Sequence, residues 1–185
     1  MIDPRHLRHG VVRPTLRAMS AWSLAAEDLV LRTAAAERCR QHGSGPGIGL
    51  WQIEPRVHRD NWAWLPDRPA AYAGVMRTIG ACDWDPLEDP VFSHAARGGL
   101  ARQLEDQLAW NLAYACAHAR IRYLRDPSPI PADAAGQARY WVRVYASAHG
   151  AESQFLAAAR GLYARYPYDG AAAASRPAPR VGWPG

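Results

Sequence analysis

The chain has 185 residues, of which 49% are hydrophobic and 21% are charged, and its formal net charge is +5. This length and composition fit one globular domain with its own core, and exclude a disordered chain or one built of membrane spans. The positive charge suits an anionic partner, but no run of five basic residues occurs, so we expect no nucleic-acid partner.

The two ends of the chain are expected to lie outside the domain. Residues 1–18 contain charges and prolines but no continuous apolar stretch, so we predict a basic N-terminal arm and no secretory signal. The domain itself is expected to span 19–166. Residues 167–185 are rich in Pro, Ala and Gly and are predicted to form a flexible tail.

The first strong helix signal begins near Ser23, whose short polar side chain can cap a helix and is followed by acidic residues. Apolar residues continue at helical spacing up to Gly43, a natural stop, so a helix is predicted between these two residues. The segment 43–67 is rich in Gly, Pro and Trp and is predicted to be a long loop. A shorter helix is predicted from about 69 to 79.

Residues 81–99 are again predicted to be irregular. One long helix is predicted from about 100 to 125, because apolar residues recur there at steps of three and four and prolines follow. Two more helices are predicted at about 132–148 and 151–165, separated by Gly150. Strand-like alternation is rare, so the predicted fold class is mainly α.

Glu37 stands near the end of the first predicted helix, among alanines and just before a glycine-rich bend. Burial in such a place disfavours the charged carboxylate, which raises its pKa and lets the acid donate a proton near neutral pH. Proton donation by a carboxylic acid is the first half of glycoside cleavage. The ordinary alternative is a surface glutamate that pairs with Arg32 or Arg40.

Three segments carry a family resemblance. Residues 49–53, Gly-Leu-Trp-Gln-Ile, resemble the Gly-Leu-Met-Gln-Ile motif that follows the catalytic glutamate in soluble lytic transglycosylases and goose-type lysozymes. Residues 117–126 look like the family helix with a Tyr-Leu pair, and 140–155 look like the segment around the family's Tyr-Asn. The resemblance covers roughly residues 22–165, and the order of its motifs is most similar to phage-encoded members of this lysozyme-like superfamily.

The resemblance implies a lysozyme-like helical domain whose long loops form a glycan groove. It implies cleavage of the β-1,4 bond between N-acetylmuramic acid and N-acetylglucosamine in bacterial peptidoglycan, with Glu37 as the catalytic acid. In the transglycosylase branch Glu37 then accepts the proton of the muramic C6 hydroxyl, which closes a 1,6-anhydro ring. Tyr145 is implied as a hydrogen-bond partner of Glu37. The expected substrate-binding residues are Gln52, Trp51, Tyr145, Glu54 and Tyr123.

A hydrolytic reaction would need a second carboxylate to activate water. Glu54 and Asp60 are the local choices, and Glu54 can equally be a structural hydrogen-bond acceptor in the loop. Trp51 is expected either to stack on a sugar face or to pack in the core. His58 is expected to be a solvated or capping histidine, with substrate contact as its alternative.

Two positions differ from the family pattern. Arg38 follows Glu37 where the family has serine, and Ala146 follows Tyr145 where it has asparagine. Because a guanidinium beside Glu37 would stabilise its carboxylate, these changes favour a rival hypothesis. In that rival, the chain is a structural or glycan-binding virion protein that keeps the fold without turnover.

The three cysteines are odd in number and widely spaced, and no Cys or His spacing matches a zinc site, so we expect neither a disulfide framework nor a metal. No cofactor is expected. The expected partners are bacterial peptidoglycan and phage virion proteins. Without a signal peptide, a protein made in the bacterial cytoplasm would reach the wall within a virion or by release to the periplasm through a lysis pore.

Overall fold

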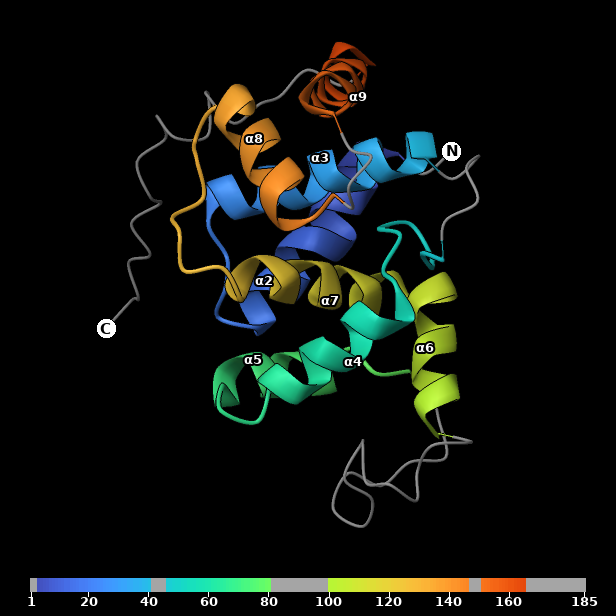
Figure 1. Ribbon diagram of the computed structural model, residues 1–185. Coiled ribbons are helices and arrows are strands. Elements are labelled where there is room, and N and C mark those ends of the chain that lie inside the picture. Colours follow the sequence, from blue (N-terminus) through green and yellow to red (C-terminus); the bar gives the residue numbers. More distant parts are fainter. Residues whose placement is uncertain (1–2, 41–45, 81–99, 147–150, 166–185) are drawn as a thin grey trace, which may run out of the picture.

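The structure is a computed structural model, of which we describe residues 3–40, 46–80, 100–146 and 151–165 (Figure 1). The described residues are mainly helical and form no β-strand, which confirms the mainly α class. In chain order the elements are α1 (Pro4–His6), the π-helical segment η1 (Leu7–Val12), α2 (Arg13–Ala18), α3 (Leu24–Arg40), α4 (Pro55–Trp64), α5 (Pro69–Met76), α6 (Leu100–Trp110), α7 (Leu112–Leu124), α8 (Ala134–Val144) and α9 (Glu152–Arg165).

Helix α7 crosses the middle of the molecule (Figure 1). It contacts α3 on one side, where α8 and α9 also pack, and α4 and α5 on the other, and α6 stands at one end. Every side chain from Tyr114 to Ile121 is buried, because α7 is covered on all sides. Its small alanines let the neighbouring helices approach closely, and α7 packs directly against α2, α3, α4, α5 and α6.

The expectation that residues 1–18 form an arm outside the domain is wrong for residues 3–18. Asp3 caps the first turn by accepting a hydrogen bond from the Arg5 amide at 2.7 Å. Pro4 stands at the start of a helix, where its missing N–H costs nothing. Leu7, Val12 and Leu16 then join the same core as the rest of the chain. Prolines read from the sequence as breakers are helix starters here.

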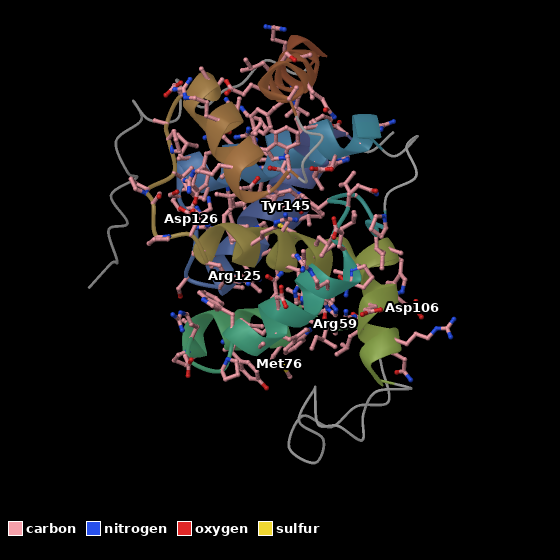
Figure 2. The ribbon with its side chains drawn as sticks, in the orientation of Figure 1. Arg59, Met76, Asp106, Arg125, Asp126 and Tyr145 are labelled. Carbon is pink, nitrogen blue, oxygen red and sulfur yellow. The ribbon has the colours of Figure 1, made fainter. Side chains whose placement is uncertain are left out.

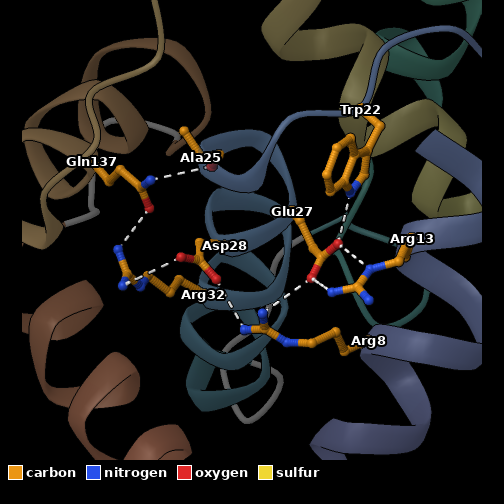
Figure 3. Close-up of polar contacts among 8 residues, drawn as sticks. All are labelled: Arg8, Arg13, Trp22, Ala25, Glu27, Asp28, Arg32 and Gln137. Carbon is orange, nitrogen blue, oxygen red and sulfur yellow. Dashed lines mark hydrogen bonds and ion pairs between the residues drawn. The ribbon is translucent and has the colours of Figure 1, made fainter. Parts of the chain in front are cut away.

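A buried network of charges joins these N-terminal helices to α3 (Figure 3). Glu27 has no exposed surface and accepts hydrogen bonds from Arg8 at 3.0 Å, Arg13 at 2.8 Å and the Trp22 indole at 2.7 Å. Arg8 also donates to Asp28 at 2.9 Å. Although burial opposes ionisation, the hydrogen bonds from Arg13 and Trp22 and the positive charges hold the pKa of Glu27 below its ordinary value. The network fixes where α3 begins.

The start of α3 agrees with the sequence, because Ser23 caps it: the Ala26 amide donates to the Ser23 hydroxyl at 3.1 Å. The helix ends at Arg40, and Gly43 lies outside the described residues. The predicted loop 43–67 is wrong in its second half, where α4 begins at Pro55. Val57, His58, Asn61 and Trp62 bury one face of α4 at helical spacing. The Gly, Pro and Trp content of 43–67 favours a loop, whereas the spacing of these four buried residues is that of a helix.

The predicted helix from about 100 to 125 is two helices, α6 and α7, separated at Asn111. The Asn111 side chain accepts a hydrogen bond from the Tyr114 amide at 3.1 Å, which caps α7, and donates to the Thr78 carbonyl oxygen at 2.7 Å. An extended backbone at Asn111 makes both contacts possible. Asn111 and Thr78 are 33 positions apart in the sequence. The spacing of apolar residues around Asn111 therefore does not reveal the break between α6 and α7.

The helices α5, α8 and α9 confirm the predictions at about 69–79, 132–148 and 151–165. Asp133 caps α8 by accepting from the Gly136 amide at 2.8 Å. The predicted irregular segment 81–99 and the predicted tail 167–185 lie outside the described residues. Within the described ranges, no helix has both the length and the apolar character that crossing a membrane requires.

Candidate functional site

Glu37 lies near the end of α3 and is buried, with 2% of its surface exposed. The side chain of Arg38, the next residue, is exposed, because consecutive helix residues point about 100° apart. The alternative of a surface glutamate is therefore wrong. A buried carboxyl group at this position is the first requirement of a general acid whose proton is held near neutral pH.

Tyr123 of α7 is buried beside the same face of α3. Its hydroxyl lies 2.6 Å from the hydroxyl of Thr33. Thr33 precedes Glu37 by four residues, so the two side chains are neighbours on one face of the helix. Thr33 has no exposed surface, and its hydroxyl donates to the Leu29 carbonyl oxygen at 2.8 Å.

Tyr145 follows directly after α8 and lies near the middle of the molecule, above α7 (Figure 2). Its hydroxyl donates to the Trp51 carbonyl oxygen at 2.8 Å. Its ring stacks on Tyr123, with centroids 5.2 Å apart. The guanidinium of Arg122 lies over the Tyr145 ring, 4.6 Å from the ring centroid. Tyr145 thus joins α7, α8 and the turn that contains Trp51.

The electrostatics tie Glu37 to both tyrosines. Burial raises the pKa of Tyr123 and of Tyr145, and the negative charge of Glu37 raises both pKa values further. For Tyr123 the hydrogen bond with Thr33 acts in the opposite direction. Both phenols therefore stay neutral over the physiological range. The structure brings together Glu37, Tyr123 and Tyr145, three of the residues assigned from the sequence.

The turn between Ile48 and Ile53 closes beside α6. Both residues exchange backbone hydrogen bonds of 3.0 Å in an isolated antiparallel bridge. Gly49 and Gln52 have positive φ angles of 69° and 50°, and such a conformation is uncommon for a residue with a side chain. The side-chain amide of Gln52 donates to the Gly49 carbonyl oxygen at 2.7 Å, which supports the left-handed backbone at Gln52.

Gly49→Ala is expected to lower the free energy of unfolding by at least about 2 kcal/mol. The left-handed conformation alone costs a non-glycine residue roughly 1–2 kcal/mol, and an added Cβ would lie 1.9 Å from the Leu108 carbonyl oxygen. Gly10→Ala is the matched control. A Cβ there meets nothing within 4 Å inside η1, so it should stabilise by about 0.5–1 kcal/mol. Urea unfolding measures the stability of both variants. Equal unfolding midpoints for Gly49→Ala and Gly10→Ala would contradict the left-handed, closely packed backbone at Gly49.

Trp51 packs in the core, which is one of the two alternatives that the sequence left open; the other was stacking on a sugar face. It has no exposed surface, and its indole N–H donates to the Val30 carbonyl oxygen at 3.0 Å. Its ring therefore holds the turn against α3 and has no face open to a sugar. The backbone of Trp51 belongs to the site instead, because its carbonyl oxygen accepts the hydrogen bond from Tyr145.

The two carboxylates considered as a catalytic base lie at the start and the middle of α4. Glu54 directly precedes the helix and is partly buried. Asp60 is on the surface, with 48% of its side chain exposed, and lies 4.0 Å from Arg125. Asp60 is thus a surface carboxylate with a basic partner, unlike the buried Glu37.

A second cluster of buried polar groups lies between α4 and α7, and includes His58. The His58 Nε2 atom accepts hydrogen bonds from the Trp62 indole at 3.1 Å and from the Tyr114 hydroxyl at 2.7 Å. The prediction of a solvated histidine is wrong, since His58 is 1% exposed. His118 lies against it, with ring centroids 4.5 Å apart, and Asn61 donates to the His118 carbonyl oxygen at 3.0 Å.

These two imidazoles are held neutral. Burial, with a smaller effect of the Arg59 charge, lowers the pKa of His58 from 6.5 to about 3. Burial and the neighbouring His58 lower the pKa of His118 well below 6.5. Among the described residues, the Nδ1 atom of His58 and the Nε2 atom of His118 have no hydrogen-bond partner. The cluster is a core packing feature that penalises protonation.

Over the part of the chain that is described, no three His, Cys, Asp or Glu side chains are placed to hold a metal ion. Cys116 is buried and free, and burial raises the pKa of its thiol. Such a thiol is a core side chain and not a reactive nucleophile.

The chain was compared with protein-family models, curated proteins and solved structures, and nothing matches in any of the three.

One member of the site was not found from the sequence. Thr33 makes the shortest hydrogen bond to Tyr123, yet threonine inside an apolar helix reads as an ordinary core residue. The signal that identifies it is spacing, because a residue four positions before Glu37 shares its helix face. Gln154 of α9 also reaches this region, donating to the Ala36 carbonyl oxygen at 3.3 Å.

Proposed function

We propose that the chain cleaves bacterial peptidoglycan at the β-1,4 bond between N-acetylmuramic acid and N-acetylglucosamine, as a lytic transglycosylase or muramidase. The observation that carries the proposal is the buried carboxyl group of Glu37 in electrostatic contact with the neutral phenols of Tyr123 and Tyr145. The resemblance of residues 49–53, 117–126 and 140–155 to lytic transglycosylases and goose-type lysozymes supports it.

In the proposed reaction Glu37 donates its proton to the glycosidic oxygen while the bond breaks through an oxocarbenium-like state. The resulting carboxylate accepts the proton of the muramic C6 hydroxyl, and that oxygen bonds to the anomeric carbon. The products are a 1,6-anhydromuramic end and a free N-acetylglucosamine hydroxyl. One carboxylate suffices, which favours this route over hydrolysis, since exposed Asp60 is paired with Arg125.

The sugar would lie in a groove beside the turn formed by residues 48–53. Gln52 is proposed to contact the glycan there, and its positive φ is the kind of backbone strain that accumulates at binding sites. Tyr145 braces Glu37 in the proposal, and Glu54 is proposed to line the glycan near the start of α4. Trp51 contributes its backbone and its packing, because its ring is fully buried.

A phage origin is proposed from the resemblance. The protein would reach the wall as part of a virion that breaches the envelope, or by release through a lysis pore. The second candidate function, a structural or glycan-binding virion protein without turnover, is favoured by Ala146, which replaces the family's asparagine. The other argument for this rival is that the Arg38 guanidinium would stabilise the Glu37 carboxylate, and the exposed position of Arg38 weakens it.

A zymogram with purified cell wall tests the proposal. The native protein should clear the wall, and Glu37→Gln should reduce clearing by about 10²–10⁴-fold, the usual contribution of general acid catalysis. Glu152→Gln, at an exposed glutamate at the start of α9, is the matched control and should clear like the native protein. Absence of clearing by all three folded proteins would favour the structural rival.

A further inference from the structure

The indole of Trp110, the last residue of α6, is largely open to solvent. It is 61% exposed, and the other exposed large apolar side chains among the described residues, Trp22 and Leu24, are 40% and 42% exposed. Neither the packing of the helices nor the proposed reaction uses the exposed surface of Trp110. Burial of this apolar surface by a ligand would be favourable.

The backbone next to Trp110 is held by side chains of α6 and of the residue that follows it. Gln107 is 1% exposed, and its side-chain oxygen accepts a hydrogen bond from the Gly80 amide at 2.7 Å. The Asn111 side chain donates to the Thr78 carbonyl oxygen at 2.7 Å. The Trp110 ring lies directly against Gly80, where an added Cβ would be 2.8 Å from the ring carbon Cη2. The indole therefore packs on a fixed segment that has room for it only because residue 80 is glycine.

Trp110 also adjoins the turn formed by residues 48–53. Gly49 packs against the last turn of α6, where an added Cβ would be 1.9 Å from the Leu108 carbonyl oxygen and 3.4 Å from the Ala109 Cα atom. Leu108 and Ala109 directly precede Trp110 in the chain. Gln52, on the same turn, is the residue proposed above to contact the glycan. A glycan strand lying on this turn therefore has the end of α6 beside it.

The size of the exposed indole fits a sugar ring better than a protein. A tryptophan side chain buries up to about 250 Å², so the exposed part of Trp110 amounts to about 150 Å². A stable protein interface needs about 800 Å² from each partner. In β-1,4-linked N-acetylglucosamine the ring substituents are equatorial, so C–H bonds cover the faces of the ring. The electron-rich face of an indole attracts such C–H groups.

Asp106 provides a polar neighbour for this indole. It precedes Trp110 by four residues, so the two side chains are neighbours on one face of α6. Asp106 is exposed, and within the described ranges it forms no hydrogen bond or ion pair (Figure 2). A carboxylate accepts hydrogen bonds from sugar hydroxyls and repels phosphate and carboxylate groups. This pair of side chains therefore favours neutral N-acetylglucosamine over a nucleic acid or a peptide-bearing muramic acid.

We propose that Trp110 and Asp106 form a sugar-binding subsite, in which the indole stacks on an N-acetylglucosamine ring and the carboxylate accepts hydrogen bonds from its hydroxyls. The identity of the ligand rests on the proposed function, because a bacterial glycan strand is the expected partner. Binding at this subsite needs no turnover, and it applies equally to a glycan-binding protein that does not cleave.

Titration calorimetry of the native protein with chitotetraose, the β-1,4-linked tetramer of N-acetylglucosamine, tests the subsite. Trp110→Ala should raise the Kd about tenfold, which corresponds to the loss of one aromatic stack. Trp110→Phe keeps a smaller ring and should raise the Kd about threefold. Leu24→Ala is the matched control, because it removes another exposed apolar side chain at the start of α3 and should keep the native Kd.

Two further variants test the parts of the subsite separately. Asp106→Ala should raise the Kd about threefold, through the loss of a hydrogen bond to the sugar. Gly80→Ala leaves both side chains in the sequence, but its Cβ must displace the Trp110 ring, so it should also raise the Kd. The indole N–H resonance of Trp110, assigned in NMR spectra by its loss in Trp110→Phe, should shift during the titration of the native protein.

Three results would overturn the subsite: no binding of millimolar chitotetraose by the native protein, an equal Kd in native protein and Trp110→Ala, or Trp110-dependent binding of a single-stranded oligonucleotide instead of the sugar. The outcome is separable from that of the cell-wall zymogram. A protein that binds chitotetraose through Trp110 without clearing cell wall would refute only the cleavage reaction. A protein that clears cell wall but has the same Kd in Trp110→Ala would refute only the subsite.

Discussion

Lowering the pH from 7 to 5 is expected to reduce the free energy of unfolding by about 4 kcal/mol through His58 and His118 alone. Both imidazoles are neutral in the folded protein, where the pKa of His58 is about 3 and that of His118 is well below 6.5. In the unfolded chain each takes up a proton near its ordinary pKa of 6.5. The unfolded state therefore binds more protons, and stability falls as the pH falls from that value toward the folded pKa.

The window between pH 7 and pH 5 separates this effect from the carboxylates. Glu27, whose pKa is lowered from 4.5, contributes stability that is lost only at lower pH. Stability is measured by urea unfolding at several pH values. His118→Phe should halve the slope of the free energy of unfolding against pH, because phenylalanine packs against Tyr114 and Trp62 without a titrating nitrogen. The control is His9→Asn, at an exposed histidine, which should leave that slope unchanged. A flat profile for the native protein would contradict the burial of this cluster.

Glu27→Gln is expected to lower the free energy of unfolding by about 3 kcal/mol at neutral pH. The substitution keeps the shape but removes the charge that faces Arg8, Arg13 and the Trp22 indole. The loss should lie at the low end for a broken buried pair, because Arg8 keeps Asp28 and the side chain of Arg13 is 28% exposed. The N-terminal helices should lose protection from amide exchange first.

Glu105→Gln is the matched control for Glu27. Glu105 forms an ion pair with Arg59 at 3.4 Å, in which more than half of the arginine side chain is exposed. Such surface pairs contribute less than about 1 kcal/mol. Thermal or urea unfolding of the two variants therefore separates a buried network from a surface pair. Equal losses would show that the N-terminal helices are not held by Glu27.

The sequence predicts a helix correctly where residues at its own ends, such as a cap, a proline or a glycine, mark its limits. Ser23 caps α3 as predicted, and α5, α8 and α9 follow from apolar spacing between prolines and glycines. The break at Asn111 was not predictable in this way, because it depends on a contact with Thr78 across the fold. The N-terminal helices were missed for a related reason. Their prolines start helices, and the partner of Arg8 is a carboxylate on another helix.

The candidate site was predictable in its residue types but not in its connections. The alanines around Glu37 correctly indicated burial, since only small side chains allow other helices to pack closely at that point. The contact between Tyr145 and the Trp51 carbonyl oxygen joins residues 94 positions apart. No spacing rule predicts such a contact, and none predicts that Trp51 uses its indole to bind the backbone of α3.

The neighbouring residues Glu37 and Arg38 illustrate why the helix face decides chemistry. Adjacent in sequence, they suggested an ion pair that would keep the carboxylate charged. In the structure one is buried and the other exposed, because side chains one residue apart point in different directions around a helix. The neutral phenols of Tyr123 and Tyr145 interact electrostatically with Glu37.

The most direct test of the central claim is mass spectrometry of the material that the protein releases from purified peptidoglycan. If Glu37 is the acid of a lytic transglycosylase, the native protein releases muropeptides with 1,6-anhydromuramic ends, and Glu37→Gln releases essentially none. Muropeptides released in equal amounts by the native and substituted proteins, or no release by the folded native protein, would contradict the account.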